Sequence, residues 1–424
     1  MKRRASITFL YYLIYCRLAV CASLLLLVEF PSAGLAFDST SKARKTFGRK
    51  DRPERYWQPK IRLQPASSAL FASNPLEEEI ASWAKDAGYG EVESCVNSGR
   101  SGWASFYKVH VSHPPKPNMA FFVKHAKSRQ AHEMFDGEAL GLKAMYECSS
   151  HTTVQDGVDD IRDDQGTSST SSIASLKIPQ VFYSGDVESS EGSSSGSLLI
   201  MEFLFLGPRR DDYAFGQAMA NLHLANPVDT APKAGNPFGK FGFPLDNTIG
   251  GTPQPNPWTH CGETKDWIEF YGTHRILHQL ELAEDEYLIQ LWKEDIAPRL
   301  DRLFEGIQVK PSLLHGDLWS GNIGSVRILE GDGDGSKPTI YDPACYWGHH
   351  EAEWGMSWCA SLGSTFWEGY RSILPEDEGF WDRKPLYDAY HQLNHYNLFS
   401  SSGYLNKARR QLETVKKALD EKKE

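Results

Sequence analysis

The chain has 424 residues, 24% of them charged and 12% aromatic, with a formal net charge of −10. This length suffices for two or three domains, or for one two-lobed domain with a large core. Residues 1–73 carry 13 basic and 4 acidic side chains, a net charge of +9, which leaves −19 for the rest. A body this acidic is unsuited to nucleic acid, because neutralising phosphates requires clustered Lys and Arg.

The first 36 residues have the layout of a signal peptide. Three basic residues at 2–4 precede an apolar run at 18–28, and small residues at 32–36 suit cleavage before Phe37. The apolar run is short for a bilayer span. We therefore expect removal of this segment and no stable membrane insertion, with a membrane anchor as the alternative.

Residues 37–73 resemble a transit peptide. They carry nine Lys or Arg against three acidic residues and show no clear apolar period. A signal peptide followed by such a stretch resembles the bipartite presequences of algae with complex plastids, which predicts a plastid location. The alternative is a secreted or endomembrane-lumen protein with a disordered basic linker.

Cysteine usage favours a reducing compartment. Five cysteines lie beyond the presumed signal peptide, an odd number, and they form no Cys-x-x-Cys pair. This pattern argues against a disulfide framework or a zinc site.

The first part of the mature chain alternates helix and strand signals. We expect a helix over 74–88, because Asn74 can cap it and acidic residues follow. Two strands are expected within 91–111, then a strand at 120–124 and a helix over 134–148. Residues 149–175 and 184–197 are rich in Ser, Thr, Asp and Gly, so we expect flexible insertions there.

The sheet lobe should end soon after the next two strands. An edge strand is expected at 178–182 and a buried one at 198–204, followed by a Gly-Pro break at 207. These signals predict four segments: a signal peptide at 1–36, a transit-like segment at 37–73, a sheet-rich first lobe at 74–206 and a second lobe at 207–424.

The second part is mainly helical. Residues 238–264 hold many Gly, Pro and Asn and predict a long ordered loop, which at this length is commonly functional. Two short strands should flank a hairpin tip at 331–335. The expected helices cover 211–224, 265–282, 285–304, 350–374 and 386–422.

The segment 313–322 is the most specific motif. It has the His-x-Asp-Leu-x-x-x-x-Asn form of a kinase catalytic loop and precedes Asp342. Phosphoryl transfer needs a carboxylate near the acceptor hydroxyl, and an amide and a second carboxylate for metal. We therefore assign Asp317 as the catalytic residue and Asn322 and Asp342 to Mg²⁺, with His315 bracing the loop. The alternative is a structural loop or an inactive kinase.

The order of the other charged residues fits a protein-kinase-like fold. Lys124, at the end of a strand, would neutralise nucleotide phosphates, and Glu138 would hold Lys124. The small-residue turn with Gly99 and Gly102 would let backbone amides approach phosphate. The expected fold is α+β and two-lobed, similar to aminoglycoside phosphotransferases, with a small antiparallel sheet lobe and a larger, mostly helical lobe. A hinge would contact adenine through its backbone, at Met201, Glu202, Phe203 and Leu204.

From about residue 76 to 408 the chain resembles the fructosamine kinase (ketosamine-3-kinase) family. The resemblance rests on residues 122–124, 134–142, 241–243, 246–250, 253–254, 267–271, 275, 279, 315–322, 342–346, 348–349 and 393–399. The middle segments are more specific than the catalytic loop, and the chain looks most like the plant and bacterial branch, which acts on ribulosamines and erythrulosamines. Two departures are visible: residues 98–103 replace a Gly run that contains a Cys in some members, and Glu353 replaces a frequent Asp.

The resemblance implies ATP-dependent, Mg²⁺-dependent phosphorylation of the C3 hydroxyl of a sugar attached to a lysine amine. The partners implied are ATP and a glycated protein or glycated lysine, and we expect a monomer or weak dimer. Fructosamine is a further possible substrate. Candidate substrate contacts are Trp319, Asn247, Trp267, Tyr271 and Glu351.

Two other readings remain open from the sequence. One is a small-molecule kinase of the aminoglycoside or choline type, and the other is an inactive nucleotide-binding scaffold. A metal cluster formed by His349, His350, Glu351 and Glu353 is also conceivable, but we expect a helix start with acidic residues there.

Overall fold

The computed structural model describes residues 75–128, 130–151, 174–188, 194–207, 209, 211–225, 239–327 and 336–422. The expectations for the presequence, for most of 149–175 and for the hairpin tip at 331–335 lie outside these residues. None of the helices within the described residues is long and apolar enough to cross a bilayer.

The first lobe is built on one antiparallel sheet with the order β1-β2-β3-β5-β4. Its strands are β1 (Val92–Arg100), β2 (Ser105–Val111), β3 (Phe121–Ala126), β4 (Val181–Glu188) and β5 (Ser194–Glu202). Helix α2 (Pro75–Asp86) covers one face, where its apolar residues join alternate residues of β2, β3 and β5 in one core cluster. The 2.0-residue period of a strand sends the remaining residues, including Leu199 and Met201, to the opposite face.

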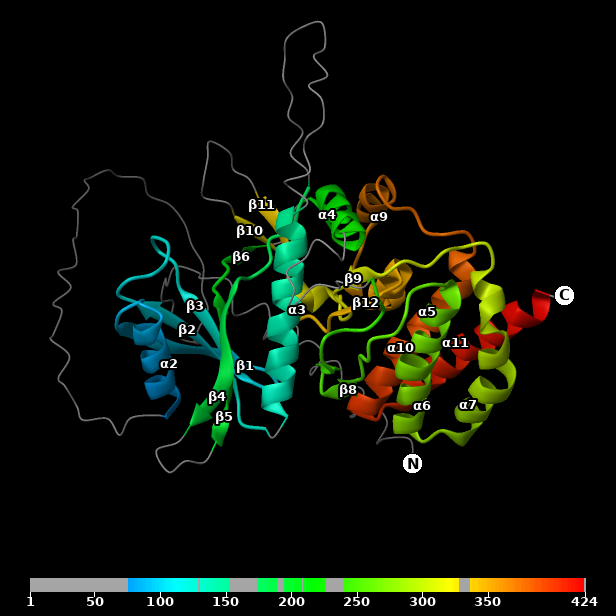
Figure 1. Cartoon of the computed structure of the whole chain (residues 1–424), viewed down its shortest axis with the longest axis horizontal. Coiled ribbons are helices and arrows are strands. Elements are labelled where there is room, and N and C mark those ends of the chain that lie inside the picture. Colours follow the sequence, from blue (N-terminus) through cyan, green and yellow to red (C-terminus); the bar gives the residue numbers. More distant parts are fainter. Residues whose placement is uncertain are drawn as a thin grey trace, which may run out of the picture. The chain divides into compact units, whose positions relative to one another are not determined.

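Helix α3 (Ala131–His151) joins the two lobes. It contacts β4 and β5 on one side and α4 and β7 of the second lobe on the other, and Figure 1 shows it between the sheet and the helical elements. Its Phe135, Leu142 and Met145 are buried in the larger core cluster. The predicted helix over 134–148 is thus present and slightly longer.

The expectation of a flexible insertion at 184–197 is wrong for its two ends. Residues 184–188 and 194–197 are strand, and Asp186 pairs with Ser197 in the β4–β5 register. The polar composition predicted a loop, but β4 is an edge strand. Such a strand can expose polar side chains while its backbone pairs with one neighbour. Buried Val187 and Leu198 supply the apolar contacts.

The second lobe begins directly after β5. The short strand β6 (Leu206–Gly207) pairs with β10 (Ile323–Arg327), which also pairs with β11 (Ser336–Ile340). Two further pairs are β7 (Asn247–Ile249) with β8 (Thr252–Gln254), and β9 (Ser312–Leu314) with β12 (Tyr346–Gly348). The predicted ordered loop at 238–264 therefore contains a small hairpin.

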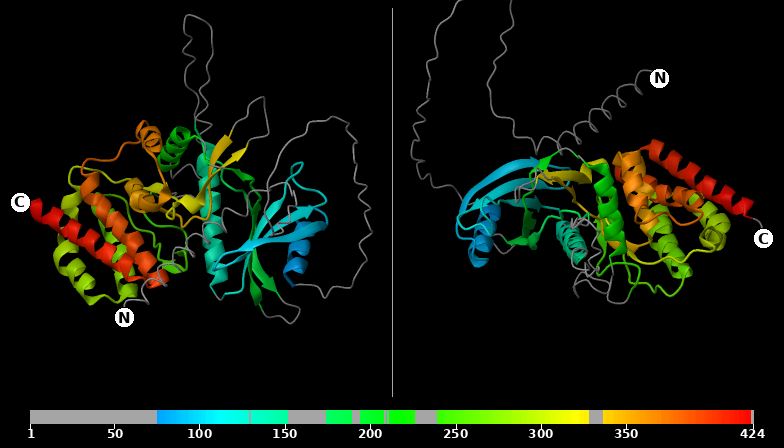
Figure 2. Two further views of the ribbon diagram at one scale, coloured as in Figure 1. Left: turned by 180° about the vertical axis from the view of Figure 1, so that it is seen from behind. Right: turned by 90° about the horizontal axis from the view of Figure 1, so that it is seen from above.

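Helices make up most of this lobe, as predicted, but several are broken. The α-helices are α4 (Asp212–Leu224), α5 (Thr264–Tyr271), α6 (His278–Ala283), α7 (Glu286–Gln290), α8 (Ser357–Ala360), α9 (Ser364–Arg371), α10 (Phe380–Phe399) and α11 (Ser402–Glu421). The π-helical turns are η1 (Gly272–Leu277) and η2 (Leu291–Ile296), and the 3-10 segments are η3 (Ala297–Phe304), η4 (Ser320–Asn322) and η5 (His350–Met356). Figure 2 shows α10 and α11 side by side, away from the sheet.

The breaks have local causes. Pro298 lacks a backbone N–H, so the helix expected over 285–304 changes to 3-10 geometry there. The helix expected over 350–374 is interrupted at Ser361, and the one over 386–422 at Ser400, with left-handed φ angles of 55° and 51°. A residue in this conformation ends a helix.

Candidate active site

Two paired strands bring the catalytic loop beside the segment that carries Asp342. Leu314 of β9 lies opposite Tyr346 of β12. The N–H of Ala344 donates to the His315 carbonyl at 2.9 Å, and the N–H of Tyr341 donates to the Asn322 carbonyl at 3.2 Å. Asp342 itself has a left-handed φ of 57°. Segments that are 19 to 32 residues apart in the sequence thus become neighbours.

Asn322 connects Asp317 with the backbone of Asp342. Its Nδ2 donates to the Asp317 carbonyl at 2.9 Å, to Oδ2 of Asp317 at 3.4 Å and to the Asp342 carbonyl at 3.3 Å. The side chain is buried. This arrangement leaves Oδ1 as the amide atom that could bind a metal, and amide and carboxylate oxygens are ligands of the kind that Mg²⁺ takes.

Lys124 connects the sheet lobe to this centre. Its Nζ lies 2.7 Å from Oε1 of Glu138 on α3, and it also contacts Oδ1 of Asp342. Burial alone would lower the pKa of Lys124, but the Asp342 and Glu138 carboxylates outweigh burial and raise it. The ammonium form of Lys124 is therefore favoured between the Glu138 and Asp342 carboxyl groups.

The environment of Asp317 changes its acidity. Burial, together with the nearby Asp342 and Glu353 charges, raises the pKa of its carboxyl to about 7, although the Asn322 hydrogen bond opposes this shift. A carboxylate with a pKa near neutrality is a better proton acceptor than an ordinary aspartate. Perturbation of this kind is characteristic of functional sites.

Glu353 holds the start of the catalytic loop, a role that the sequence left open. Its two carboxylate oxygens accept the backbone N–H of His315 at 2.6 Å and that of Gly316 at 3.1 Å. The His315 ring lies 2.9 Å from the Tyr341 carbonyl through Nε2 and accepts the Asp317 N–H at Nδ1. His315 is therefore placed as a brace, as expected from the motif.

The predicted phosphate loop is tightly bonded to itself. The N–H of Ser101 donates to the Ala104 carbonyl at 2.8 Å, and the hydroxyl of Ser101 accepts the N–H groups of Trp103 and Ala104, each at 3.1 Å. The N–H of Gly99 donates to Oδ1 of Asn97. A phosphate bound by the Gly99 amide would therefore have to displace the bond to Asn97. The space around Gly102 is more open, because a Cβ added there would meet no atom within 4 Å.

The predicted hinge lies at the end of β5. Met201 pairs with Phe122 of β3, and Lys124 pairs with Phe106 of β2, so these four side chains share one sheet face. The N–H of Phe203 donates to the Ala120 carbonyl.

The other hinge groups also have partners. The carboxylate of Glu202 pairs with Lys177 at 2.5 Å, and the backbone N–H of Glu202 donates to the Gln180 carbonyl at 2.8 Å. Leu204 follows the strand and is half-buried.

Two of the five substrate candidates lie near the catalytic segments. Trp319 is half-buried and covers Gly321, where an added Cβ would lie 2.2 Å from its ring. Asn247 is buried, and its Nδ2 donates to the Cys345 carbonyl at 2.8 Å. Asn247 thus fixes the β7–β8 hairpin to the segment after Asp342.

The other three substrate candidates are not brought to the site. Trp267, Tyr271 and Glu351 are at most 1% exposed and lie in the interior of the helical lobe. The indole of Trp267 donates to the Tyr387 hydroxyl at 3.3 Å, and Glu351 pairs with Arg383. Their burial leaves them no direct contact with a substrate.

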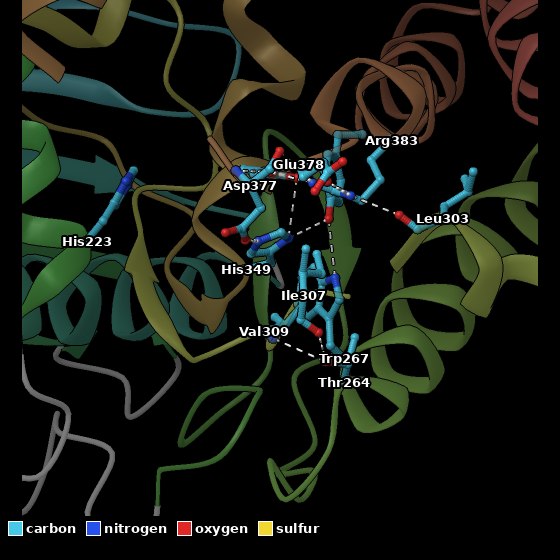
Figure 3. A network of polar contacts seen from close by, with 12 residues as sticks. His223, Thr264, Trp267, Leu303, Ile307, Val309, His349, Asp377, Glu378 and Arg383 are labelled. Atoms are coloured by element: carbon cyan, nitrogen blue, oxygen red, sulfur yellow. Dashed lines mark hydrogen bonds and ion pairs between the residues drawn. The ribbon is translucent and has the colours of Figure 1, made fainter. Parts of the chain in front are cut away.

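The possible metal cluster predicted from the sequence contains Asp377 in place of Glu353, and Figure 3 shows His349 and Asp377 within a network of polar contacts that includes Arg383. His349, His350, Glu351 and Asp377 bring ligand atoms within 4.8 Å of one another. However, Arg383 donates to both carboxylate oxygens of Glu351 at 2.8 Å. Nε2 of His349 lies 3.2 Å from Asp377. The Arg383 guanidinium already supplies the positive charge that balances Glu351, which supports the interpretation of this segment as a structural helix start.

The chain is similar to several known proteins. A family model described as "Fructosamine kinase" matches residues 165–418. Protein-ribulosamine 3-kinase, chloroplastic, of Arabidopsis thaliana is 37% identical over 344 residues, which cover 80% of this chain and 87% of that protein. The protein of the same name from Oryza sativa subsp. indica is 38% identical over 348 residues, which cover 80% and 83% of the two chains.

A solved structure shares the fold. The crystal structure of a Thermobifida fusca protein, named provisionally as a fructosamine-3-kinase, superposes with a TM-score of 0.56 at 25% identity. The match covers 80% of this chain and 98% of that one. The two-lobed α+β fold expected from the sequence is confirmed.

Proposed function

Because this chain belongs to the fructosamine kinase family, we propose that it is an ATP-dependent ketosamine 3-kinase. The observation that carries the proposal is the convergence of Asp317, Asn322 and Asp342 from two paired strands, with Lys124 reaching them from the sheet. Protein-ribulosamine 3-kinases are among its relatives, so the proposed substrates are ribulosamine or erythrulosamine adducts on protein lysines, with fructosamine adducts as a further possibility.

Asp317 accepts or orients the proton of the attacking hydroxyl. Its raised pKa, about 7, makes this carboxylate a matched base near neutral pH. The proton leaves the sugar oxygen as that oxygen bonds to the γ-phosphorus and the bond to the β-phosphate oxygen breaks. Asn322 fixes the position of Asp317 through its amide nitrogen.

Asp342 and Asn322 would hold Mg²⁺, which when bound neutralises the β- and γ-phosphate oxygens. Their carboxylate and amide oxygens fit a hard cation. Lys124 would turn from Asp342 toward phosphate while it keeps its bond to Glu138. The sheet face with Phe106, Phe122 and Met201 would receive the adenine ring, with the Met201–Leu204 segment at its edge.

The position of the new phosphate explains a repair role. In a ketosamine, a phosphate on C3 is β to the C2 carbonyl and is a good leaving group. Elimination then frees the amine and needs no hydrolytic residue on the enzyme. Deglycation of protein lysines would follow from phosphorylation alone.

A plastid location fits the basic presequence and the chloroplastic names of the relatives. A reporter fused to residues 1–73 tests it. Import into the plastid is the expected result, and secretion of the reporter would contradict it. We further propose that ATP and a glycated protein or lysine are the partners, and that the enzyme is a monomer or weak dimer, which sedimentation would test.

Turnover of ATP with ribulose-lysine and with fructose-lysine, beside Asp317→Asn, tests the function. We expect activity on ribulose-lysine that falls by at least about 10²-fold in the variant. Activity on choline or aminoglycosides without any on ketosamines would overturn the proposal. Retained ATP binding with no turnover of any amine-linked sugar would indicate an inactive scaffold.

A further inference from the structure

An exposed tryptophan of the nucleotide loop packs on the β7–β8 turn of the other lobe. A Cβ added at Gly251 would lie 2.6 Å from Cη2, 2.8 Å from Cζ3 and 3.2 Å from Cζ2 of Trp103. The ring edge therefore fills the space that any larger residue at Gly251 would need. Trp103 is nevertheless 53% exposed, so it is not a core residue of either lobe.

The loop that carries Trp103 is fixed in shape. The N–H groups of Trp103 and Ala104 both donate to the hydroxyl of Ser101. The N–H of Ser101 in turn donates to the Ala104 carbonyl. These bonds hold residues 101–104 as a compact turn between β1 and β2. The turn is therefore a compact unit that carries the indole.

The receiving turn is supported from behind. Gly250, with a φ of +62°, is so close to α10 that an added Cβ would lie 2.8 Å from Cδ1 of Leu398. Gly251 thus faces the indole of Trp103, from the turn between β1 and β2, and Gly250 faces Leu398 of α10. The Trp103 ring rests on a fixed surface.

The hairpin is also anchored to the catalytic segment. Asn247 donates to the Cys345 carbonyl at 2.8 Å, and Nε2 of Gln254 donates to the Ala344 carbonyl at 3.0 Å. Both acceptors lie within three residues of Asp342. The contact between Trp103 and Gly251 therefore connects the nucleotide loop with the segment that would hold metal and substrate.

We propose that Trp103 is a positioning residue that latches the nucleotide loop onto the Gly250–Gly251 turn and so couples ATP binding to sugar binding. The coupling to sugar rests on the proposed function. A nucleotide held by the loop favours the indole in contact with the turn, and a sugar bound against the hairpin favours the same contact. Because such coupling is reciprocal, each substrate raises the affinity for the other.

The test uses the full chain and isothermal titration of a non-hydrolysable ATP analogue with Mg²⁺. Trp103→Ala should weaken binding about three- to tenfold, the size of one aromatic contact. Gly251→Ala should give a similar loss, because its Cβ collides with the ring. Gly251 does not have a left-handed φ, so this change tests the contact and not the backbone.

The double variant distinguishes a latch from two independent effects. If both single changes break one contact, the double variant loses no more than either one. Trp103→Phe should restore part of the affinity. Trp381→Ala, which removes another exposed tryptophan at the start of α10, is the matched control and should leave binding unchanged. Unchanged affinity in Trp103→Ala, or additive losses, would overturn the latch.

A separate measurement tests the coupling. In the wild type the KM for ribulose-lysine should fall as ATP rises to saturation, and in Trp103→Ala this dependence should disappear while Tm stays at the control value. A KM that is independent of ATP in the wild type would refute the coupling. If no ketosamine is turned over, the proposed function fails, but the analogue titration still decides the latch.

Discussion

Glu353 caps the catalytic loop at His315: one carboxylate oxygen accepts the His315 N–H at 2.6 Å, and the other accepts the Gly316 N–H at 3.1 Å. Nε2 of His223 lies 3.4 Å from the same carboxylate. Burial alone would raise the pKa of Glu353, but His223 and the His315 N–H lower it. A charged group at the base of the loop thus sets the position of Asp317, two residues after His315.

Replacing Glu353 by Gln should damage both stability and turnover. The amide NH₂ would face one of the two backbone N–H groups and leave that donor unsatisfied, which costs about 1–3 kcal/mol. The free energy of unfolding at pH 7 should fall by about this amount, and kcat should fall because the loop loses its fixed position. Glu353→Asp, which keeps the charge, is the control and should lose less of both.

The pH dependence of this effect has a definite sign. The folded-state pKa of Glu353 is depressed, so its ionised form stabilises the protein above the ordinary pKa of a glutamate and ceases to do so as pH falls. The stability difference between wild type and Glu353→Gln should therefore shrink on acidification. A difference that grows toward low pH in denaturant titrations would contradict the assignment.

The rate of phosphoryl transfer should report the ionisation of Asp317. Its pKa is raised to about 7, so the carboxyl is neutral and inactive as a base well below this pH. We expect kcat/KM for the ketosamine to rise with pH through about 7 and then level off. A profile that is already flat from pH 5 upward would exclude Asp317 as the titrating base, and Asp317→Asn should abolish the step.

The catalytic centre was accessible from sequence because its parts follow one another in a fixed order. The spacing of Asp317 and Asn322 within one loop, and Asp342 after a short strand, predicted residues that the structure places together. Lys124 and Glu138 were likewise predicted from order, and they form an ion pair. Their catalytic roles remain proposals.

Contacts between distant segments could not be predicted from sequence. Glu353 meets His315 across 38 residues, and Glu351 meets Arg383 across 32, with no local signal for either. For Trp267 and Tyr271 a signal existed: they are four residues apart on α5, the spacing of one helix face, which indicates a core position. A residue that a chain shares with a family can serve packing as readily as contact with substrate.

Lys124 should be required for catalysis with ATP and not only for the stability of the fold. Lys124→Met removes the only group shown to bridge Glu138 and Asp342 in the described residues. We expect kcat to fall by about 10²- to 10³-fold, the usual effect of removing one charge-stabilising donor. Glu138→Gln keeps the ammonium and a hydrogen-bond acceptor, so steady-state kinetics should show a smaller loss. Equal losses would indicate that both act only on folding.

The buried pair of Arg383 and Glu351 should stabilise the helical lobe without metal. Arg383→Met leaves the buried Glu351 carboxylate without its guanidinium partner, and breaking a buried pair in this way costs about 3–5 kcal/mol. The double variant Arg383→Met with Glu351→Gln should recover part of this loss, because no unpaired charge remains. EDTA should leave the Tm of the nucleotide-free enzyme unchanged. A Tm that falls with EDTA and recovers with Zn²⁺ would instead favour a metal at His349 and Asp377, and the guanidinium would then have to leave Glu351.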